Sequence, residues 1–517
     1  MRMSGRTLTG WALIAFTANL SYAQSGLPED LAEELDAMFA AAQLDVRAPG
    51  LVYGVVDRDN MLRVRGYGVR DLESGAPATA DTAFRIASMT KMMTALLVHD
   101  LEDQGKISLG DPAEKYVPAL AAWRYPTKDS RKVVVRDLLN HTAGFVTDDP
   151  WADRQLGISA KTMDAYLADA NPFSHAPGTH WEYSNFGYAI LGRIIENVTG
   201  QTYAERLRER ILDPLGMKDT HLDGTEIEDA DKAKAYNWTD DGFEPEPFLA
   251  SGAFDPLGGI WTTASDYQVF VSWILSAWPP RDDRDPGPIP RRVVRSVTDS
   301  QRIRGPFIRP GATGSEDCMM ASAYAMGLSV TAHCTAGMLL GHGGGFPGYG
   351  TYVLMSPEQG WGVFAFTNHT YGGPGRVVWE AAAELIDSAH FEPDGQYLEP
   401  DAGLTRAYAG VQEIYRRGDI DGGGVRFANN FFLDRSRERW NRQLGALKET
   451  AGECKTDMAL EHDGRLSGEF NWECETARVT GYLFLSPVSP AAVQYLHMRA
   501  ITLAADGREI IIDHDFH

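Results

Sequence analysis

The stretch from residue 84 to residue 101 constrains the fold of this chain more than any other. Apolar residues recur there at every third or fourth position, a spacing typical of a helix with one buried face. Ser88 falls in the first turn of this predicted helix, where free backbone N–H groups and the helix dipole favour negative charge. Lys91 follows one turn later on the same side. Together they can act as a nucleophile and its base.

The pair formed by Ser88 and Lys91 is a weak signal by itself. It fixes only two letters, so a chain of 517 residues contains such a pair by chance about once. On this pair alone, a helix-capping serine followed by an exposed lysine is the preferred interpretation. The assignment therefore depends on other parts of the chain.

Length and charge limit the architecture and the partners. A chain of 517 residues exceeds one ordinary core, so two domains are expected, and 44% hydrophobic residues suffice to pack them. The formal net charge is -23. Because nucleic acids and anionic membranes attract basic surfaces, neither is an expected partner.

Residues 1–23 have the pattern of a secretory signal peptide. Arg2 and Arg6 precede a largely apolar run from Trp11 to Leu20, and the small residues up to Ala23 match a cleavage site. The apolar run is too short to span a bilayer, although an uncleaved membrane anchor remains the alternative. The sequence therefore predicts a secreted or periplasmic protein with no membrane span after cleavage.

Four cysteines in an exported chain suggest two disulfides. Local pairing gives Cys318–Cys334 and Cys454–Cys474, although three connectivities are possible and reduced, buried cysteines remain an alternative. The cysteines lack the spacing of zinc ligands. No metal and no cofactor are predicted.

The chain divides by pattern into a large N-terminal region and a small C-terminal one. We expect a domain over residues 27–390, a linker over 391–403 that carries Pro, Asp and Gly, and a second domain over 404–517. In the large domain, helices are predicted over residues 27–44, 88–105, 187–198, 265–277 and 376–389. Strands are predicted over 51–56, 61–68, 323–330, 338–341, 351–355 and 362–368.

Two regions carry weaker signals. The stretch 279–317 is rich in Pro, Gly and charge and has little periodicity, so we expect a long surface excursion near the mouth of a site. The small domain has helical patterns over 404–417 and 434–453, and strand patterns over 456–462, 465–472, 477–485 and 493–512. It contains no catalytic constellation.

Two further motifs carry side chains suited to chemistry. Tyr183 and Asn185 lie at a junction between a loop and a helix, where a packed ring and a helix cap are the simpler interpretation. His342 precedes three glycines between two predicted strands, a pattern that more often marks a turn. The run Gly343-x-Gly345-x-x-Gly348 fits a dinucleotide fingerprint formally, but a strand pattern follows it instead of a helix, so that interpretation is rejected.

Taken together, the motifs resemble those of serine hydrolases related to class C β-lactamases, penicillin-binding proteins, D-aminopeptidases and secreted esterases, a β-lactamase-related, peptidase S12-like superfamily. That superfamily carries Ser-x-x-Lys, Tyr-x-Asn, and Lys-Thr-Gly or His-x-Gly in the order found here. Flanking patterns match at residues 135–144, at Pro177-Gly178 and at residues 258–264. The resemblance covers residues 30 to 390.

The resemblance implies a role for each matching residue. Ser88 would attack a carbonyl and form an acyl-enzyme, while Lys91 and Tyr183 would transfer protons. Asn185 would hold the substrate amide and fix Lys91. The backbone N–H groups of Ser88 and Gly345 would form an oxyanion hole. The substrate-binding strand would consist of His342, Gly343, Gly344 and Gly345.

His342 departs from the β-lactamase pattern, which has lysine there. A neutral imidazole offers less positive charge to a substrate carboxylate. We therefore expect an exported hydrolase that cleaves an ester or a D-amino-acid amide in a small molecule or short peptide. The alternatives are β-lactamase or DD-carboxypeptidase activity at the same site, or a non-catalytic protein that binds a peptide or cell-wall fragment. The absence of G-x-S-x-G argues against an α/β-hydrolase esterase.

The implied fold is α+β, a β-lactamase/transpeptidase-like domain with an antiparallel sheet flanked by helices and an additional all-helical region. The helix that begins at Ser88 would lie between these two parts. His141, in one of the flanking patterns, is interpreted as a structural group at a helix end. The C-terminal domain is expected to be a small α+β unit. Its role and the oligomeric state stay open.

Overall fold

The computed structural model describes residues 26–149, 151–299, 302–309, 318–388, 390–391, 399–504 and 508–512. The predicted signal peptide and residues 392–398 of the predicted linker lie outside these ranges. The chain forms two compact units. The first comprises residues 1–275, 297–356 and 361–391, and the second comprises residues 276–296, 357–360 and 392–517.

A nine-stranded sheet organises the first unit. Its strands follow the order β3-β2-β1-β13-β12-β11-β10-β9-β8, and neighbouring strands are antiparallel. The central strands are β1 (Gly50–Val56), β13 (Trp361–Thr367), β12 (Tyr349–Ser356) and β11 (Gly337–Phe346). The flanking strands are β2 (Met61–Asp71), β3 (Ala76–Pro77), β10 (Ser329–His333), β9 (Cys318–Tyr324) and β8 (Arg302–Arg309).

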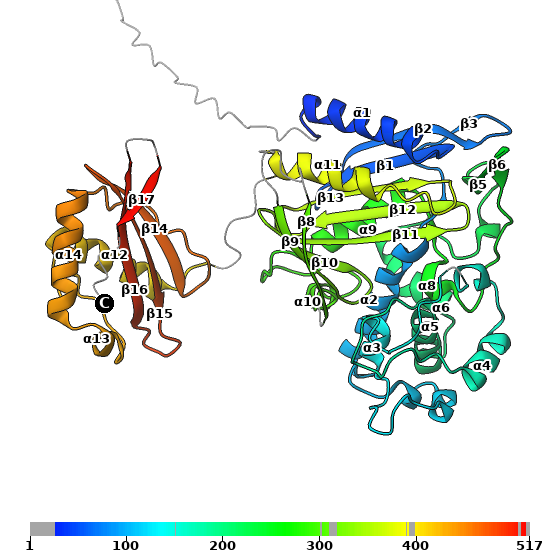
Figure 1. The fold of residues 1–517 in the computed structure, drawn as a ribbon, viewed down its shortest axis with the longest axis horizontal. Coiled ribbons are helices and arrows are strands. Elements are labelled where there is room, and N and C mark those ends of the chain that lie inside the picture. Colours follow the sequence, from blue (N-terminus) through cyan, green and yellow to red (C-terminus); the bar gives the residue numbers. More distant parts are fainter. Residues whose placement is uncertain are drawn as a thin grey trace, which may run out of the picture. The chain divides into compact units, whose positions relative to one another are not determined.

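Helices cover both faces of the sheet centre, and every residue of β1 and β13 is buried as a result. On one face lie α1 (Glu29–Asp45) and α11 (Gly375–Asp387), whose apolar sides pack against β1, β12 and β13 (Figure 1). On the other face lies α9 (Ala264–Leu275), which contacts the same three strands. The α+β fold predicted from the sequence is confirmed.

An all-helical region adjoins the sheet (Figure 1). Its helices are α3 (Val135–Leu139), α4 (Ala160–Asp169), α5 (Asn185–Thr199), α6 (Tyr203–Leu207), α7 (Asp213–Leu215) and α8 (Asp255–Gly258). Helix α2 (Thr90–Asp103) packs against α5, α6 and α8, and its residues from Thr90 to Leu101 are all buried. A central helix enclosed on all sides can hold side chains from its first turn away from water.

The second unit contains its own sheet and core. Strands β14 (Ser467–Glu473), β15 (Arg478–Leu485), β16 (Val493–Leu503) and β17 (Glu509–Ile512) form an antiparallel four-stranded sheet. Helices α12 (Ala402–Arg417), α13 (Phe431–Asp434) and α14 (Arg437–Ala451) pack against it around an apolar cluster that includes Trp472 and Tyr415. Cys454 and Cys474 form a disulfide. The side chain of Cys318 lies outside the described residues.

Several predicted strands differ from the observed ones. The stretch 279–317, predicted as irregular, contains α10 (Arg291–Ser296) and the edge strand β8, whose Gly305 and Pro306 hid the pattern. A turn at residues 325–328 divides the predicted strand 323–330 between β9 and β10. The predicted strand 456–462 is a loop with one isolated bridge at Glu461. Among the described helices, none has the length and hydropathy needed to cross a membrane.

Candidate active site

Backbone contacts hold Ser88 at the entrance to α2. Ser88 lies in a single 3-10 turn, Ala87–Met89, that leads directly into α2. Ala87 has a φ of 50°, a left-handed conformation that non-glycine residues rarely adopt. Next to it, the Ile86 N–H donates to the Ile260 carbonyl over 2.9 Å, and the Thr351 hydroxyl donates to the Ile86 carbonyl over 2.9 Å. The strained turn is thus fixed from both sides.

The structure brings Ser88, Lys91 and Tyr183 into hydrogen-bonding contact. The Ser88 Oγ lies 2.9 Å from the Lys91 Nζ and 2.9 Å from the Tyr183 hydroxyl. Ser88 and Lys91 come from one helical turn, whereas Tyr183 is 95 residues further along the chain and precedes α5. The three residues therefore meet because α2 and α5 pack side by side.

Lys91 is completely buried, and its Nζ has two further partners. It lies 2.7 Å from the Asn185 Oδ1 and 2.6 Å from the Leu257 carbonyl oxygen. Burial lowers the pKa of Lys91 to about 8, and the charges of Asp149, Asp153 and Asp148 oppose that shift. The amine is therefore poised to change protonation near neutral pH.

Tyr183 donates its hydroxyl hydrogen to Ser88 and lies among other rings. Burial raises the pKa of Tyr183 well above its usual value, and Tyr324 raises it further, while the hydrogen bond to Ser88 opposes this shift. The ring of His141 lies 4.3 Å from the Tyr183 ring, and the His141 Nδ1 accepts the Ser184 N–H over 3.2 Å. His141 therefore packs against the ring and holds the backbone beside it. The phenol is neutral in this environment.

Asp148 orients the beginning of α5, which carries Asn185. Its carboxylate accepts the N–H groups of Asn185 and Phe186, both over 2.8 Å, and the Ser184 hydroxyl over 2.9 Å. A carboxylate at a helix N-terminus satisfies free N–H groups and complements the helix dipole. The Asn185 side-chain amide also donates to Asp149. These contacts fix Asn185 against Lys91.

Asp148, Asp149 and Asp153 were not identified from the sequence. Asp153 is buried, its Oδ2 accepts the Tyr371 hydroxyl over 3.1 Å, and burial raises its pKa to about 7. The only signal in the sequence is three aspartates within six positions. Such a run is usually a solvated loop. Nothing in the local sequence indicates that it packs near Lys91, which lies at least 57 positions earlier.

The glycines from Gly343 to Gly345 lie inside strand β11, and not between two strands as predicted. The pairing of β10 with β11 ends at Gly341, whereas β12 pairs with β11 as far as Phe346. A Cβ on Gly344 would lie 2.4 Å from the Ile86 carbonyl oxygen and 3.1 Å from the Ala87 Cβ. This half of β11 therefore borders the turn that carries Ser88, and only glycine fits at residue 344.

His342 begins this half of β11 and is buried. Its Nδ1 lies 2.5 Å from the Gly343 carbonyl oxygen, and its Nε2 lies 2.9 Å from the Tyr324 hydroxyl. Because a carbonyl oxygen only accepts, the Nδ1 carries the hydrogen. Both ring nitrogens are thus engaged within the protein. In the described part of the chain, no group of three or more His, Cys, Asp or Glu residues is arranged to hold a metal ion.

Solved structures with this fold are similar to most of the chain. The octameric penicillin-binding protein homologue from Pyrococcus abyssi is 22% identical, with a TM-score of 0.57, and the match covers 93% of this chain and 95% of that one. The D-alanine carboxypeptidase AmpC from Burkholderia cenocepacia is 24% identical, with a TM-score of 0.53, over 69% of this chain and 99% of that one. These matches show the fold.

Sequence relatives agree with the structures. Protein flp from Staphylococcus aureus strain MW2 is 25% identical over 344 residues, which are 66% of this chain and 64% of that protein. The chain thus spans less than two thirds of that relative. An uncharacterized Mycobacterium tuberculosis protein, MT1414, is 29% identical over 342 residues, or 60% of this chain and 83% of that protein. A family model described as Beta-lactamase matches residues 31–387, and the chain therefore belongs to the β-lactamase family of serine hydrolases.

Proposed function

We propose that this protein hydrolyses an ester or amide that carries no carboxylate, as an esterase or D-amino-acid peptidase would, through an acyl-enzyme on Ser88. The observation that carries the proposal is the set of three hydrogen-bond partners around the Lys91 Nζ. Two of them, the Asn185 Oδ1 and the Leu257 carbonyl oxygen, can only accept hydrogen bonds.

This arrangement determines what a neutral Lys91 can do. A neutral amine has two N–H groups and one lone pair. The two acceptor oxygens take both N–H groups, so the lone pair is left for the third partner, the Ser88 hydroxyl at 2.9 Å. Neutral Lys91 is then the general base that removes the Ser88 proton. The lowered pKa of about 8 makes this form accessible in mildly alkaline solution.

The remaining steps use the other groups of the site. As the Ser88 Oγ forms a bond to the substrate carbonyl carbon, the backbone N–H groups of Ser88 and Gly345 would stabilise the developing oxyanion. Tyr183, hydrogen-bonded to Ser88, gives its hydroxyl proton to the leaving group as the scissile bond breaks, and the proton held by Lys91 restores the phenol. Water then attacks the acyl-enzyme by the same route in reverse and releases the acid.

Two features favour a substrate without negative charge over a β-lactam or a peptide with a terminal carboxylate. Both nitrogens of His342 are engaged within the protein, so this residue offers no free cation where the β-lactamase pattern has lysine. Asp148, Asp149 and Asp153 also place negative charge around Lys91. An anionic substrate would be repelled there. D-alanine carboxypeptidase activity, named for one structural neighbour, therefore ranks below hydrolysis of a substrate without a carboxylate and is the second candidate.

A non-catalytic binding role on the same fold is the other candidate. A binding protein has no need for a buried lysine with a lowered pKa beside a serine, and burial of a cation is costly. The complete set formed by Ser88, Lys91 and Tyr183 favours catalysis.

A rate panel on the purified protein tests the proposal. A chromogenic ester, a D-alanyl amide and a cephalosporin are compared at equal concentration. We expect the ester or the amide to be hydrolysed at least ten times faster than the cephalosporin, since about 1.4 kcal/mol of differential transition-state binding gives that ratio. A cephalosporin that is hydrolysed fastest contradicts the proposed substrate class, and failure of all three substrates contradicts catalysis.

We also propose that the protein is exported. The pattern of residues 1–23 supports this, as does the Cys454–Cys474 disulfide, because disulfides persist mainly in oxidising compartments. Fractionation of cells that express the full chain, with N-terminal sequencing of the product, tests it. The expected product lacks residues 1–23, and an intact product in the cytosolic fraction contradicts export.

A further inference from the structure

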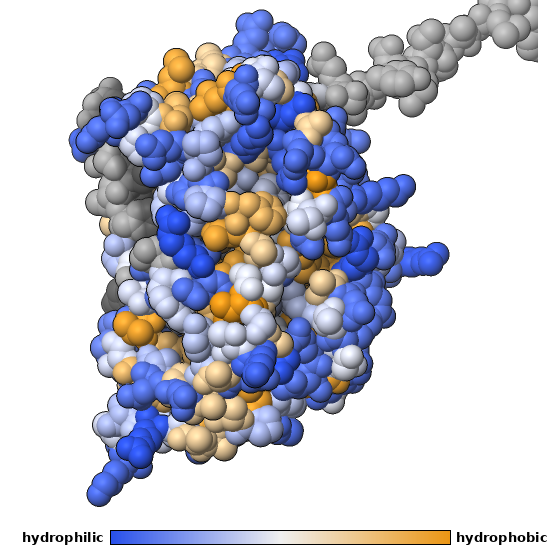
Figure 2. All heavy atoms as spheres, turned by 90° about the vertical axis from the view of Figure 1, so that its right-hand side faces the viewer, coloured by the Kyte–Doolittle hydropathy of each residue, from blue (hydrophilic) through white to orange (hydrophobic). Residues whose placement is uncertain are grey.

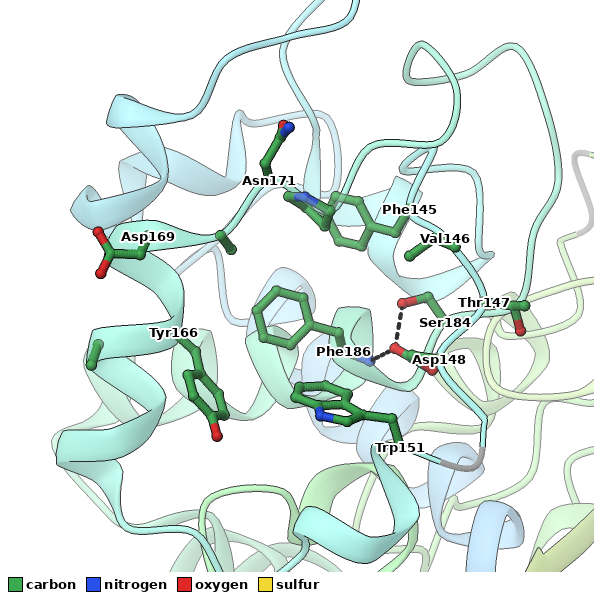
Figure 3. A pocket seen from close by; sticks show the side chains of 13 residues that line it. Phe145, Val146, Thr147, Asp148, Trp151, Tyr166, Asp169, Asn171, Ser184 and Phe186 are labelled. Atoms are coloured by element: carbon green, nitrogen blue, oxygen red, sulfur yellow. Dashed lines mark hydrogen bonds between the residues drawn. The ribbon is translucent and has the colours of Figure 1, made fainter.

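A cavity of about 620 Å³ adjoins the candidate active site on the side of the helical region. Its walls come from α4, from the beginning of α5 and from residues 145–151, and four rings face it: Phe145, Trp151, Tyr166 and Phe186 (Figure 3). A cavity of this size is typical of sites for small organic molecules. We refer to it as the aromatic cavity. Apolar side chains also interrupt the otherwise hydrophilic surface shown in Figure 2.

The polar groups nearest the active site leave this cavity apolar. The Asp148 carboxylate already accepts the Phe186 N–H and the Ser184 hydroxyl (Figure 3), and it also accepts the Asn185 N–H. An apolar group that enters the cavity therefore leaves none of these atoms without a hydrogen bond. Burial of such a group against four rings is favourable.

The aromatic cavity shares its inner wall with the catalytic cluster. Ser184 and Phe186 line the cavity, and Asn185 between them reaches Lys91, which in turn contacts Ser88. Likewise Asp148 lines the cavity, while its neighbour Asp149 accepts the Asn185 amide. The beginning of α5 therefore lies between the cavity and the residues around Lys91.

The charges around the cavity exclude one class of occupant. Its thirteen lining residues include Asp148 and Asp169 but no Lys, Arg or His. A carboxylate or phosphate would have no cationic partner there and would face two acidic side chains. These charges disfavour an anionic occupant, and the four rings favour an apolar one.

From these observations we infer that the substrate of the Ser88 hydrolase carries an uncharged, apolar acyl group that occupies the aromatic cavity. This inference rests on the proposed function, because it describes the acyl part of the same substrate. It adds that the cavity selects the acyl group by size and hydrophobicity. The part of the substrate that leaves plays no role in this selection.

A series of p-nitrophenyl esters from acetate to octanoate tests the inference on the wild-type protein. We expect kcat/KM to rise by about two- to fourfold per added methylene, up to the length that fills the cavity. The ester of a dicarboxylic acid of the same length as octanoate should be hydrolysed at least tenfold more slowly, because its free carboxylate is charged.

Two variants of α4 test whether the rise of kcat/KM with chain length comes from the aromatic cavity. Ala165 and Ala168 are both exposed residues of this helix, but only Ala165 lines the cavity. Ala165→Trp places a large ring at the cavity wall, so the ratio of kcat/KM for octanoate to that for acetate should fall towards one. Ala168→Trp adds the same ring outside the cavity and should keep the wild-type series.

The outcomes separate the inference from the proposed function. If the wild-type protein hydrolyses the acetate ester through Ser88 but shows no rise with chain length, the cavity assignment is wrong and the proposed function stands. The same holds if Ala165→Trp keeps the rise. If no ester or amide is hydrolysed, the proposed function is wrong, and the inference is overturned with it.

Discussion

The two units of this protein bury very different side chains. In the first unit, the side chains of Lys91, Asn185 and Asp153 are buried, and each of them is hydrogen-bonded. In the second unit, within residues 399–504 and 508–512, the buried polar or charged side chains are Gln443, Thr456 and Ser486, and none of them titrates. Its core is an apolar cluster around Trp472.

This difference locates the chemistry. Burial of a charge or a polar group is unfavourable unless it is paired, so a fold keeps such groups where they serve a function. The first unit holds a lysine with a lowered pKa beside a serine. The part of the second unit within residues 399–504 and 508–512 has an ordinary apolar core. We therefore expect substitutions in the first unit to change activity and substitutions in the second to change stability.

The largest effect is expected for Ser88→Ala. Loss of the nucleophile should lower kcat/KM for the preferred ester or amide by about 10³-fold or more. Circular dichroism should stay unchanged, because Ser88 has no role in the core. Ser108→Ala, at an exposed serine of the same unit, is the control and should keep wild-type activity. Retained activity in Ser88→Ala would place the nucleophile elsewhere.

Tyr183→Phe should lower kcat by about 10²- to 10⁴-fold, the usual contribution of proton transfer by a positioned side chain. The ring still packs against His141, so the melting temperature should change little. Tyr495→Phe, at an exposed tyrosine of the second unit, is the control. A Tyr183→Phe variant with wild-type kcat would remove the phenol from the proposed mechanism.

Trp472→Ala tests the other half of the comparison. Trp472 is fully buried and donates its Nε1 hydrogen to the Tyr408 hydroxyl over 2.9 Å. The cavity left behind should lower the free energy of unfolding of the second unit by about 3–5 kcal/mol, measured by thermal and denaturant unfolding. Leu433→Ala, at a residue with 83% exposure, should cost less than about 0.5 kcal/mol. A loss of catalysis in folded Trp472→Ala would contradict the separation of roles.

The smallest effect is expected in the pH profile. Since the base is neutral Lys91, kcat/KM should rise with pH with a midpoint of about 8. The charge of Asp153 raises the pKa of Lys91, so Asp153→Asn should move the midpoint to lower pH. Asp129→Asn, at an exposed aspartate, should leave the midpoint in place. A shift to higher pH would contradict the assigned electrostatics.

The sequence predicted the parts of the site that depend on local periodicity. Ser88 and Lys91 meet because they are one helical turn apart, and the spacing alone indicates this. The roles of Tyr183 and Asn185 were predicted only from the resemblance to a family, because contacts over more than 90 residues leave no local signal in the sequence. The extension of strand β11 through Gly343, Gly344 and Gly345, where only β12 pairs with it, was not predicted for a related reason. Glycines favour turns locally, but here they permit close approach to the Ser88 turn.

Loops and edge strands account for the remaining errors. Asp148 and Asp153 lie in a segment without periodicity, and their burial depends on how α5 packs. Strand β8 contains Gly305 and Pro306 and exists because β9 pairs with it. The loop at 456–462 has a strand-like pattern but forms only one bridge with β14. Whether such a segment forms a strand depends on the strand it pairs with and not on its own composition.

Covalent labelling of Ser88 tests the central claim most directly. The wild-type protein is incubated with a fluorophosphonate, and its intact mass and the modified peptide are measured. The mechanism predicts one adduct, located on Ser88, that forms more slowly in Lys91→Ala because the base is missing. An unlabelled wild-type protein, or an adduct on any other residue, would contradict the assignment of Ser88 as the nucleophile.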